Sequence, residues 1–301
     1  DFPLKFIEIL NLKKTYNFMK ELYIIGSNKN DMYFIHTPVA SIFFRLANFF
    51  RKNKILYFVH GFRFHNKKKK IIEYFFLIIE YVLSFKTQYY ININKHDFKF
   101  TKKNLNKKTI LINGVGIKLK KTKLQSKKVI RKACIISAYK KEKGYLSILN
   151  QIRKINYHFP QLSIDCYGYG NFEDEFKKYK MDNIKNIKFY SFKNNIYKVI
   201  KNYDFLIHPS LREGLPVSVI QCMSLGLPVI GRDIRGINDL IKHNVNGLIF
   251  KKDQDILKCI SVMLIAKKFN FLAKNAKKKI DISYSDSFIS KKIKTYIDEI
   301  I

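Results

Sequence analysis

The chain has 301 residues, which is enough for one large or two medium domains with an ample core. A hydrophobic content of 47% and an aromatic content of 15% are typical of a folded globular protein and exclude a disordered one. The formal net charge of +35 has two interpretations: the lysine excess of an AT-rich genome, or attraction to an anionic bilayer surface or to phosphate-bearing substrates. Nucleic acid is a third anionic partner, but the sequence contains no recognition motif for it, so we expect no nucleic-acid binding.

Cysteine usage and hydropathy predict a cytosolic protein. The four cysteines are far apart and form neither a C-x-x-C pair nor a metal-binding spacing, so we expect reduced core residues. No signal peptide is visible, and the longest apolar run, residues 71–85, contains two glutamates and is too short to span a bilayer. The cysteines are Cys134, Cys166, Cys222 and Cys259.

The first part of the chain alternates short apolar runs with segments of helical periodicity. We predict buried strands over residues 32–35, 55–59, 89–93 and 109–112. Helices are expected within residues 1–30, over 39–50 with Thr37 as N-cap, and over about 69–86. Strands and helices that alternate in this way indicate a doubly wound parallel sheet.

A basic, polar stretch over residues 118–128 is the expected linker, and a second alternation starts at Val129. Its predicted strands cover residues 133–137, 162–167, 187–190, 205–207 and 227–230. Its predicted helices cover residues 145–155, 172–179, 196–203, 217–225, 253–266 and 288–301. The chain therefore repeats one βα plan twice, and the predicted fold class is α/β.

Residues 205–250 form the most informative unit of the second half. A buried strand is followed by Glu213, and Pro216 then begins a helix that ends at Gly226. Residues 227–230 supply the next buried strand, so the unit is strand, acidic loop, helix and strand. The free amides and the dipole of a helix N-terminus attract anions, phosphate above all, and here they follow a carboxylate.

The same stretch resembles the nucleotide-sugar-binding signature of retaining GT-B glycosyltransferases of family 4. That signature runs E-G-x-P, a second Glu, then G-x-P-V-[IV], with N-G-x-L further on. Here it is carried by Glu213-Gly214-Leu215-Pro216, Gln221, Gly226-x-Pro228-Val229-Ile230 and Asn246-Gly247-Leu248. Other segments resemble family members that build bacterial surface polysaccharides, among them His36-Thr37-Pro38 and Arg235-Gly236.

The resemblance implies two Rossmann-like doubly wound parallel-sheet domains that face each other across a cleft. Residues 1–122 would form the acceptor-side domain and residues 123–283 the nucleotide-sugar donor domain, with the last helix, 284–301, crossing back to the first. Family members usually begin with a strand, a glycine-containing loop and a helix that precede the equivalent of residues 1–30. We therefore expect an N-terminally incomplete first domain.

Candidate site residues follow predicted strands, and ligands of parallel sheets bind outside the carboxyl ends of the strands. This rule collects His36, His60, Lys143, Gly168, Gly170 and Glu213. A histidine or a G-x-G at a strand end also has a purely structural interpretation, as a cap or a tight turn. The resemblance favours a functional role for His60, because similar enzymes place a histidine that touches the donor sugar there.

The resemblance assigns Glu213 and His60 to catalysis. The residues assigned to the donor and its nucleotide are Lys143, Gly168, Arg212, Gly214, Leu215, Pro216, Val217, Ser218 and Gln221. Lys143 stands where the family has a lysine on the donor diphosphate, and Arg212 would reach a phosphate or pair with Glu213. Gln221 replaces the family's ribose-binding Glu, so a neutral hydrogen bond of about 0.5–1.5 kcal/mol would replace a charged one of about 1.5–3 kcal/mol.

By resemblance, the chain would transfer a sugar with retention from an NDP-sugar, expected to be a UDP-sugar. The acceptor would be a glycan or a lipid-linked oligosaccharide of lipopolysaccharide or capsule synthesis, at the inner face of the cell membrane. The one D-x-D spacing, Asp253-Gln254-Asp255, falls at the start of the helix predicted over 253–266, so we expect no metal and no further cofactor. The competing interpretation is an inactive GT-B remnant that acts as a basic membrane-surface binding module.

Overall fold

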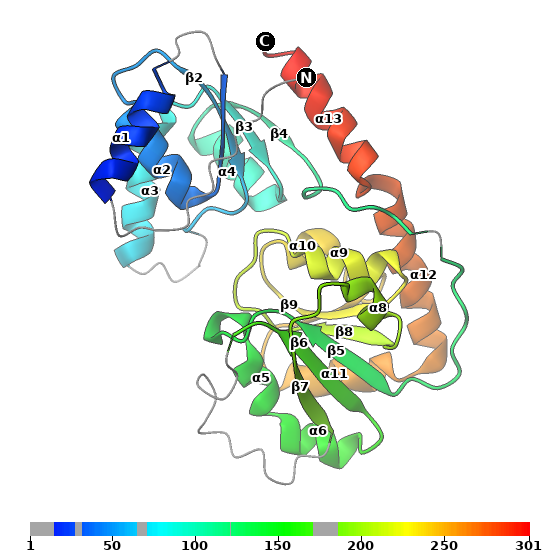
Figure 1. The fold of residues 1–301 in the computed structure, drawn as a ribbon. Helices are drawn as coiled ribbons and strands as arrows, with labels where there is room; N and C mark the ends of the chain where they lie inside the picture. The colour runs from blue at the N-terminus through cyan, green and yellow to red at the C-terminus, as the bar shows by residue number, and fades with distance from the viewer. Residues whose placement is uncertain (1–14, 28–31, 65–70, 121, 171–185) are drawn as a thin grey trace. The chain divides into compact units, whose positions relative to one another are not determined.

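A computed structural model describes residues 15–27, 32–64, 71–120, 122–170 and 186–301, with the side chains of residues 15–18 left aside (Figure 1). The chain forms two compact units, Asp1–Ile112 with Ile300, and Asn113–Glu299 with Ile301. Residues 113–122 and 284–299, which the resemblance assigned to the first domain, thus group with the second unit. The predicted helix over 172–179 lies outside the described residues.

The first unit contains a four-stranded parallel sheet in the order β1-β2-β3-β4. The strands are β1 (Met32–His36), β2 (Lys54–Val59), β3 (Tyr89–Asn92) and β4 (Lys108–Leu111), each within two residues of its predicted bounds. The helices are α1 (Thr15–Ile25), α2 (Pro38–Ala47), α3 (Ile71–Ser84) and α4 (Lys95–Asn104). Helix α4 was not predicted, because the positions that it buries include Asp97 and Thr101 in place of an apolar stripe.

The core of this unit joins apolar side chains of the sheet to the inner faces of α1 and α2, including Leu22, Phe44, Ile55 and Tyr90. Thr37 occupies the predicted N-cap position of α2, but the expected capping hydrogen bond is not formed. Its φ of 62° turns the backbone to the left-handed side.

A buried ion pair links α2 to α3. The Arg45 guanidinium, fully shielded from solvent, donates to both carboxylate oxygens of Glu80 at 2.7 and 2.9 Å. It also donates to the Ser41 carbonyl at 3.1 Å and to the Thr87 hydroxyl at 3.2 Å. A buried charge is stable only when it is paired and hydrogen-bonded in this way, so the network fixes which side of α3 faces inward.

The second unit contains a six-stranded parallel sheet in the order β10-β9-β8-β5-β6-β7. The strands are β5 (Lys132–Ile136), β6 (Ser163–Gly168), β7 (Ile187–Ser191), β8 (Phe205–His208), β9 (Val229–Arg232) and β10 (Leu248–Phe250). Counted from β5, this is the 3-2-1-4-5-6 order of Rossmann-like folds, with the topological switch point between β5 and β8. The predicted α/β fold class with two parallel sheets is confirmed.

The helices of the second unit differ more from prediction than the strands do. They are α5 (Tyr145–Leu149), α6 (Ile152–His158), α8 (Ile196–Ile200), α9 (Val217–Ser224), α10 (Ile237–Leu240), α11 (Asp255–Met263), α12 (Ala266–Ser283) and α13 (Asp286–Asp298), with the 3₁₀ turn η2 (Lys141–Lys143). The single helix predicted over 145–155 is two helices, and α10, α12 and strand β10 were not predicted. All four cysteines are buried and free, as predicted.

Among the residues that the structure describes, no helix combines the length and the apolarity needed to cross a bilayer.

Replacing Arg45 with Met should lower the free energy of unfolding of the first unit by about 3–5 kcal/mol, because it leaves the Glu80 carboxylate buried without its partner. Adding Glu80→Leu in the same chain should recover most of the loss, since an apolar pair needs no compensating charge. Urea unfolding monitored by tyrosine fluorescence measures both.

As a control, Asp281→Asn breaks a partly exposed pair with Lys277 on α12 and should change stability by less than about 0.5 kcal/mol. A single Arg45→Met loss as small as the control's would contradict the structural role of the buried pair.

Candidate active site

Two loops meet at the switch point of the second sheet. One follows β5 and includes η2, and the other follows β8. The backbone N–H of Leu211 donates to the Glu142 carbonyl at 2.9 Å and joins the loops directly. Gly144 has a φ of +74°, and a Cβ at this position would lie 2.0 Å from the Pro209 carbonyl oxygen. Only glycine fits at this position, so the loops approach as closely as backbones can.

The Glu213 carboxylate contacts two side chains, Lys143 and His208. Its Oε1 accepts from Lys143 Nζ at 2.8 Å and lies 3.2 Å from His208 Nε2. The Glu213 side chain is 12% exposed, that of His208 is 3% exposed, and that of Lys143 is 26% exposed. Burial alone would raise the pKa of Glu213, but the hydrogen bond and charge of His208, together with Lys143, lower it to about 2. The group is therefore an ionised acceptor at any physiological pH.

A third loop, after β9, supports the acidic loop from its other side. Arg235 Nε donates to the Glu213 carbonyl at 3.1 Å. Gly236 has a φ of +79°, and a Cβ there would lie 2.3 Å from the Gly214 carbonyl oxygen. Arg232, at the end of β9, donates through Nε to the Pro209 carbonyl at 2.9 Å. The backbone that carries Glu213 is thus fixed by its neighbours on both sides.

Helix α9 begins directly after the acidic loop. Pro216 is its N-cap, with β-region backbone angles and no side-chain cap, so the first amides of the helix have no partner within it. The helix ends in a Schellman motif: Gly226 N–H donates to the Met223 carbonyl, Leu227 N–H donates to the Cys222 carbonyl, and Gly226 has a φ of +83°. The predicted start and end of this helix are confirmed.

The structure brings most of the predicted donor residues to this edge of the second sheet. The two hydrogen-bonded loops and the first turn of α9 carry Lys143, Arg212, Glu213 and residues 214–218. Gly168 ends β6, the strand beside β5, and a Cβ there would lie 2.1 Å from the Ser137 carbonyl oxygen.

Gln221 lies one turn further along α9, near Tyr197 of α8 (Ile196–Ile200). Burial raises the pKa of the Tyr197 phenol, and the nearby Gln221 side chain offsets part of that rise.

His60 lies in the first unit, where it forms a pair with His36. The Nδ1 of His36 and the Nε2 of His60 are 3.2 Å apart, and both rings stack on Phe58. Burial lowers the pKa of His36, and burial together with the charge of His36 lowers the pKa of His60 to about 4. Both imidazoles are consequently neutral at pH 7, and one ring N–H donates to the other ring's lone pair.

No site role was predicted for His208. It is the last residue of β8 and lies five positions before Glu213. The rule that collected polar residues at the ends of parallel strands would have collected it too.

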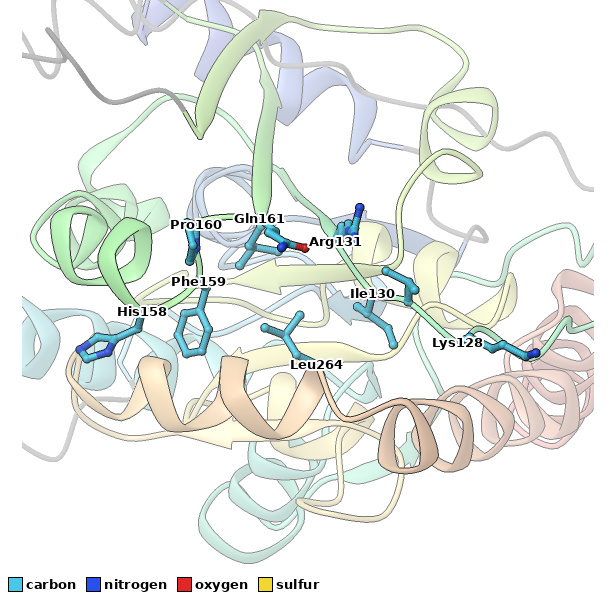
Figure 2. A pocket seen from close by; sticks show the side chains of 10 residues that line it. Lys128, Ile130, Arg131, His158, Phe159, Pro160, Gln161 and Leu264 are labelled. Atoms are coloured by element: carbon cyan, nitrogen blue, oxygen red, sulfur yellow. The ribbon is translucent and has the colours of Figure 1, made fainter.

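The structure also has a cavity away from these loops. It has a volume of about 360 Å³ and lies beside the starts of β5 and β6 (Figure 2). It is lined by Lys128, Val129, Ile130, Arg131, His158, Phe159, Pro160, Gln161, Leu162 and Leu264. None of the predicted site residues lines this cavity, because they follow the carboxyl ends of the strands.

Comparison with known proteins identifies the family of the chain. Residues 117–280, more than half of the chain, match the model of the family "Glycosyl transferases group 1", and the chain belongs to that family. It is 25% identical over 317 residues to the UDP-Gal:alpha-D-GlcNAc-diphosphoundecaprenol alpha-1,3-galactosyltransferase of Escherichia coli, a match that covers 97% of this chain and 82% of that protein.

Two further proteins are similar to the chain. The chain is 26% identical over 249 residues to the putative glycosyltransferase EpsD of Bacillus subtilis. This match covers 76% of the chain and 65% of EpsD, so the chain spans just under two thirds of that relative. The crystal structure of Anabaena Alr3699/HepE with UDP and glucose superimposes with a TM-score of 0.79 at 17% identity, over 96% of this chain and 83% of that chain. This likeness shows the fold, which is the two-domain Rossmann-like GT-B fold.

The depressed pKa of His60 makes stability depend on pH. The unfolded chain binds a proton at His60 below about pH 6.5, whereas the folded chain does so only below about pH 4. Stability should therefore fall as pH falls from 6.5 to 4, and His60→Gln should remove on the order of 1–3 kcal/mol of that decline. Urea unfolding at pH 7 and pH 4.5 measures it.

The control is His158→Gln, the same substitution at an exposed histidine, measured at the same two pH values. An equal decline in wild type and His60→Gln would show that His60 titrates normally in the folded chain.

Proposed function

We propose that this chain is a retaining glycosyltransferase of family 4 that transfers a sugar from a UDP-sugar to a glycan or lipid-linked acceptor. The observation that carries the proposal is the Lys143–Glu213 ion pair beside the N-terminus of α9, at the topological switch point of the second sheet. Nucleotides bind at such switch points in open parallel sheets. The names of the similar proteins support the donor, since the Escherichia coli relative is named for UDP-Gal and the Anabaena structure contains UDP.

The donor diphosphate would meet Lys143 and the free amides at the start of α9. An ammonium has three N–H donors, so Lys143 can keep one on Glu213 while another meets a phosphate oxygen. The amides of residues 217 and 218 add fixed dipoles that point at the same charge. As the bond from the anomeric carbon to the diphosphate breaks, negative charge grows on the leaving oxygen, and this preorganised cluster stabilises it. We assign this charge stabilisation to these groups without a metal ion.

Glu213 would act on the sugar itself. Both of its contacts use Oε1, so we assign Oε2 to accept from a hydroxyl of the donor sugar. The ionised carboxylate also offsets the positive charge that develops on the sugar ring, and we do not assign it as a nucleophile. The acceptor hydroxyl attacks the anomeric carbon from the side that the diphosphate leaves, which retains the configuration, and its proton passes to the departing phosphate oxygen.

The remaining assignments follow the resemblance. Gln221 would accept from a ribose hydroxyl, and the glycine at residue 168 would let backbone approach the base. Arg212 is assigned to a phosphate, and His60 to the donor sugar as a neutral hydrogen-bond partner. We place the enzyme in synthesis of a bacterial surface polysaccharide, lipopolysaccharide or capsule, as a cytoplasmic protein peripheral to the inner face of the cell membrane.

The test of the proposal is a screen of UDP-sugars, with release of UDP and transfer to a diphosphoundecaprenol-linked sugar as readouts and NMR of the product's anomeric proton. We expect turnover with one UDP-sugar, an α-linked product from an α-linked donor, and no loss of rate in EDTA. A folded chain whose melting temperature does not respond to UDP and that releases none would refute the proposal.

Glu213→Gln should lower kcat by at least about 100-fold, equivalent to about 2.7 kcal/mol, because a neutral amide cannot offset positive charge on the sugar. UDP alone should still raise the melting temperature of the variant, since the α9 amides are intact. The exposed Glu21, changed to Gln, is the matched control and should retain wild-type rates. Wild-type kcat in Glu213→Gln would remove the carboxylate from the mechanism.

Lys143→Met should weaken UDP binding about 10- to 100-fold, the loss of one charged hydrogen bond of about 1.5–3 kcal/mol. It should also raise the pKa of Glu213, because one of the groups that lower it is gone. Isothermal titration with UDP measures the affinity. Lys141→Met, two residues earlier in the same 3₁₀ turn and exposed, is the control. Equal affinities in both variants would mean that the phosphate lies elsewhere.

A further inference from the structure

Both glutamates of helix α3 face inward, whereas most of its apolar side chains face outward. Its buried residues are Glu73, Glu80, Leu83 and Ser84. Its exposed side chains are all apolar or tyrosine, namely Ile71, Ile72, Tyr74, Phe75, Ile78, Tyr81 and Val82. Phe85 follows directly and is 79% exposed. We call these eight residues the α3 face (the helix is labelled in Figure 1). Monomeric proteins rarely expose a contiguous apolar surface of this kind unless it binds something.

The buried ion pair holds the α3 face outward. Glu80 accepts two hydrogen bonds from the fully buried Arg45 of α2. Rotating α3 to hide its apolar residues would break these bonds and leave a charge unpaired. The exposure of the α3 face is thus built into the fold of the first unit.

The apolar surface continues past the end of the helix and carries cations at its border. Lys86 Nζ donates to the Arg51 carbonyl at 2.8 Å and lies 5.6 Å from the Phe49 ring. The Arg51 guanidinium stacks 3.8 Å from the Tyr23 ring. Phe50, which lies between Phe49 and Arg51 in the sequence, is 97% exposed.

A further cation borders the middle of the helix, where the Arg63 guanidinium lies 4.7 Å over the Phe76 ring. Along α3 both acids are buried, and the cations Arg51, Arg63 and Lys86 lie beside aromatic rings at its border.

We propose that the α3 face docks on a bilayer surface that contains anionic phospholipid. An apolar helix face with tyrosines and bordering cations matches the headgroup layer, where aromatic rings and lysine or arginine stems are most stable. The positive border complements the lipid charge. The 14 residues of α3 span only about 21 Å, against about 30 Å for the hydrocarbon core, so the helix lies in the plane of the interface.

This inference rests on the proposed function in one respect. A lipid-linked acceptor is anchored in the membrane, so an enzyme that docks there meets its substrate at a high local concentration. The docking itself needs no nucleotide and no sugar, which lets the two proposals be tested separately.

The experiment is flotation of the purified chain with vesicles made of equal parts phosphatidylcholine and phosphatidylglycerol. The test variant is Phe75→Ser with Ile78→Ser, whose side chains are 55% and 62% exposed. The matched control is Phe271→Ser with Ile282→Ser on α12, the same residue types at 51% and 63% exposure. Wild type and control should bind the vesicles equally. The test variant should bind at least tenfold more weakly, equivalent to about 1.4 kcal/mol, with an unchanged melting temperature.

The proposal would be overturned by no vesicle binding by wild type, by equal loss in the test and control variants, or by wild-type binding by the test variant. A wild-type dimer that the test variant converts to monomers, without an effect on flotation, would assign the α3 face to a second copy and would equally overturn it. The effect of UDP on the melting temperature is measured on the same samples. A wild-type chain that responds to UDP but does not float rejects only the docking surface, whereas a wild-type chain that floats but does not respond to UDP rejects only the proposed function.

Discussion

The contact between Lys143 and Glu213 is the interaction on which the rest of the site depends. It joins the loop after β5 to the loop after β8, the two strands on either side of the switch point. A carboxylate that is nearly buried is stable only with partners, and Lys143 and His208 supply them. The charges of the site therefore hold one another in place in the free protein. A site arranged in this way needs little reorganisation when a charged substrate arrives, which is the condition for strong electrostatic stabilisation.

Close backbone approach makes that arrangement possible. At residues 144 and 236 the chain has positive φ and passes so near another carbonyl that any Cβ would collide with it. Three loops, from β5, β8 and β9, thereby share a volume that side chains would otherwise fill. Both positions combine a left-handed backbone with a steric limit, and either requirement alone would already favour glycine. The precision of the site is consequently a property of backbone packing more than of the charged groups themselves.

The strands could be predicted from the sequence because buried parallel strands appear as short apolar runs between breakers. Helix α4 could not, since it buries Asp97 and Thr101. Helix α12 could have been, because its buried apolar residues recur at helical spacing. In the site, Lys143 and Glu213 were each identified from a motif. Their contact could not be foreseen, because it spans 70 positions and depends on β5 and β8 being neighbours, which local sequence does not encode.

Each unit contains a carboxylate paired with a cation, and the two pairs serve different ends. Arg45 is completely buried, makes bonds to several groups around Glu80, and has no route to a ligand. Lys143 is 26% exposed, sits on a short turn, and has N–H groups beyond the one that Glu213 uses. The first pair can only fix the orientation of a helix, and so keeps an apolar face outward. In the second pair, Lys143 can donate a further hydrogen bond to an anionic substrate. Exposure of the cation, not the presence of the pair, separates a structural ion pair from a functional one.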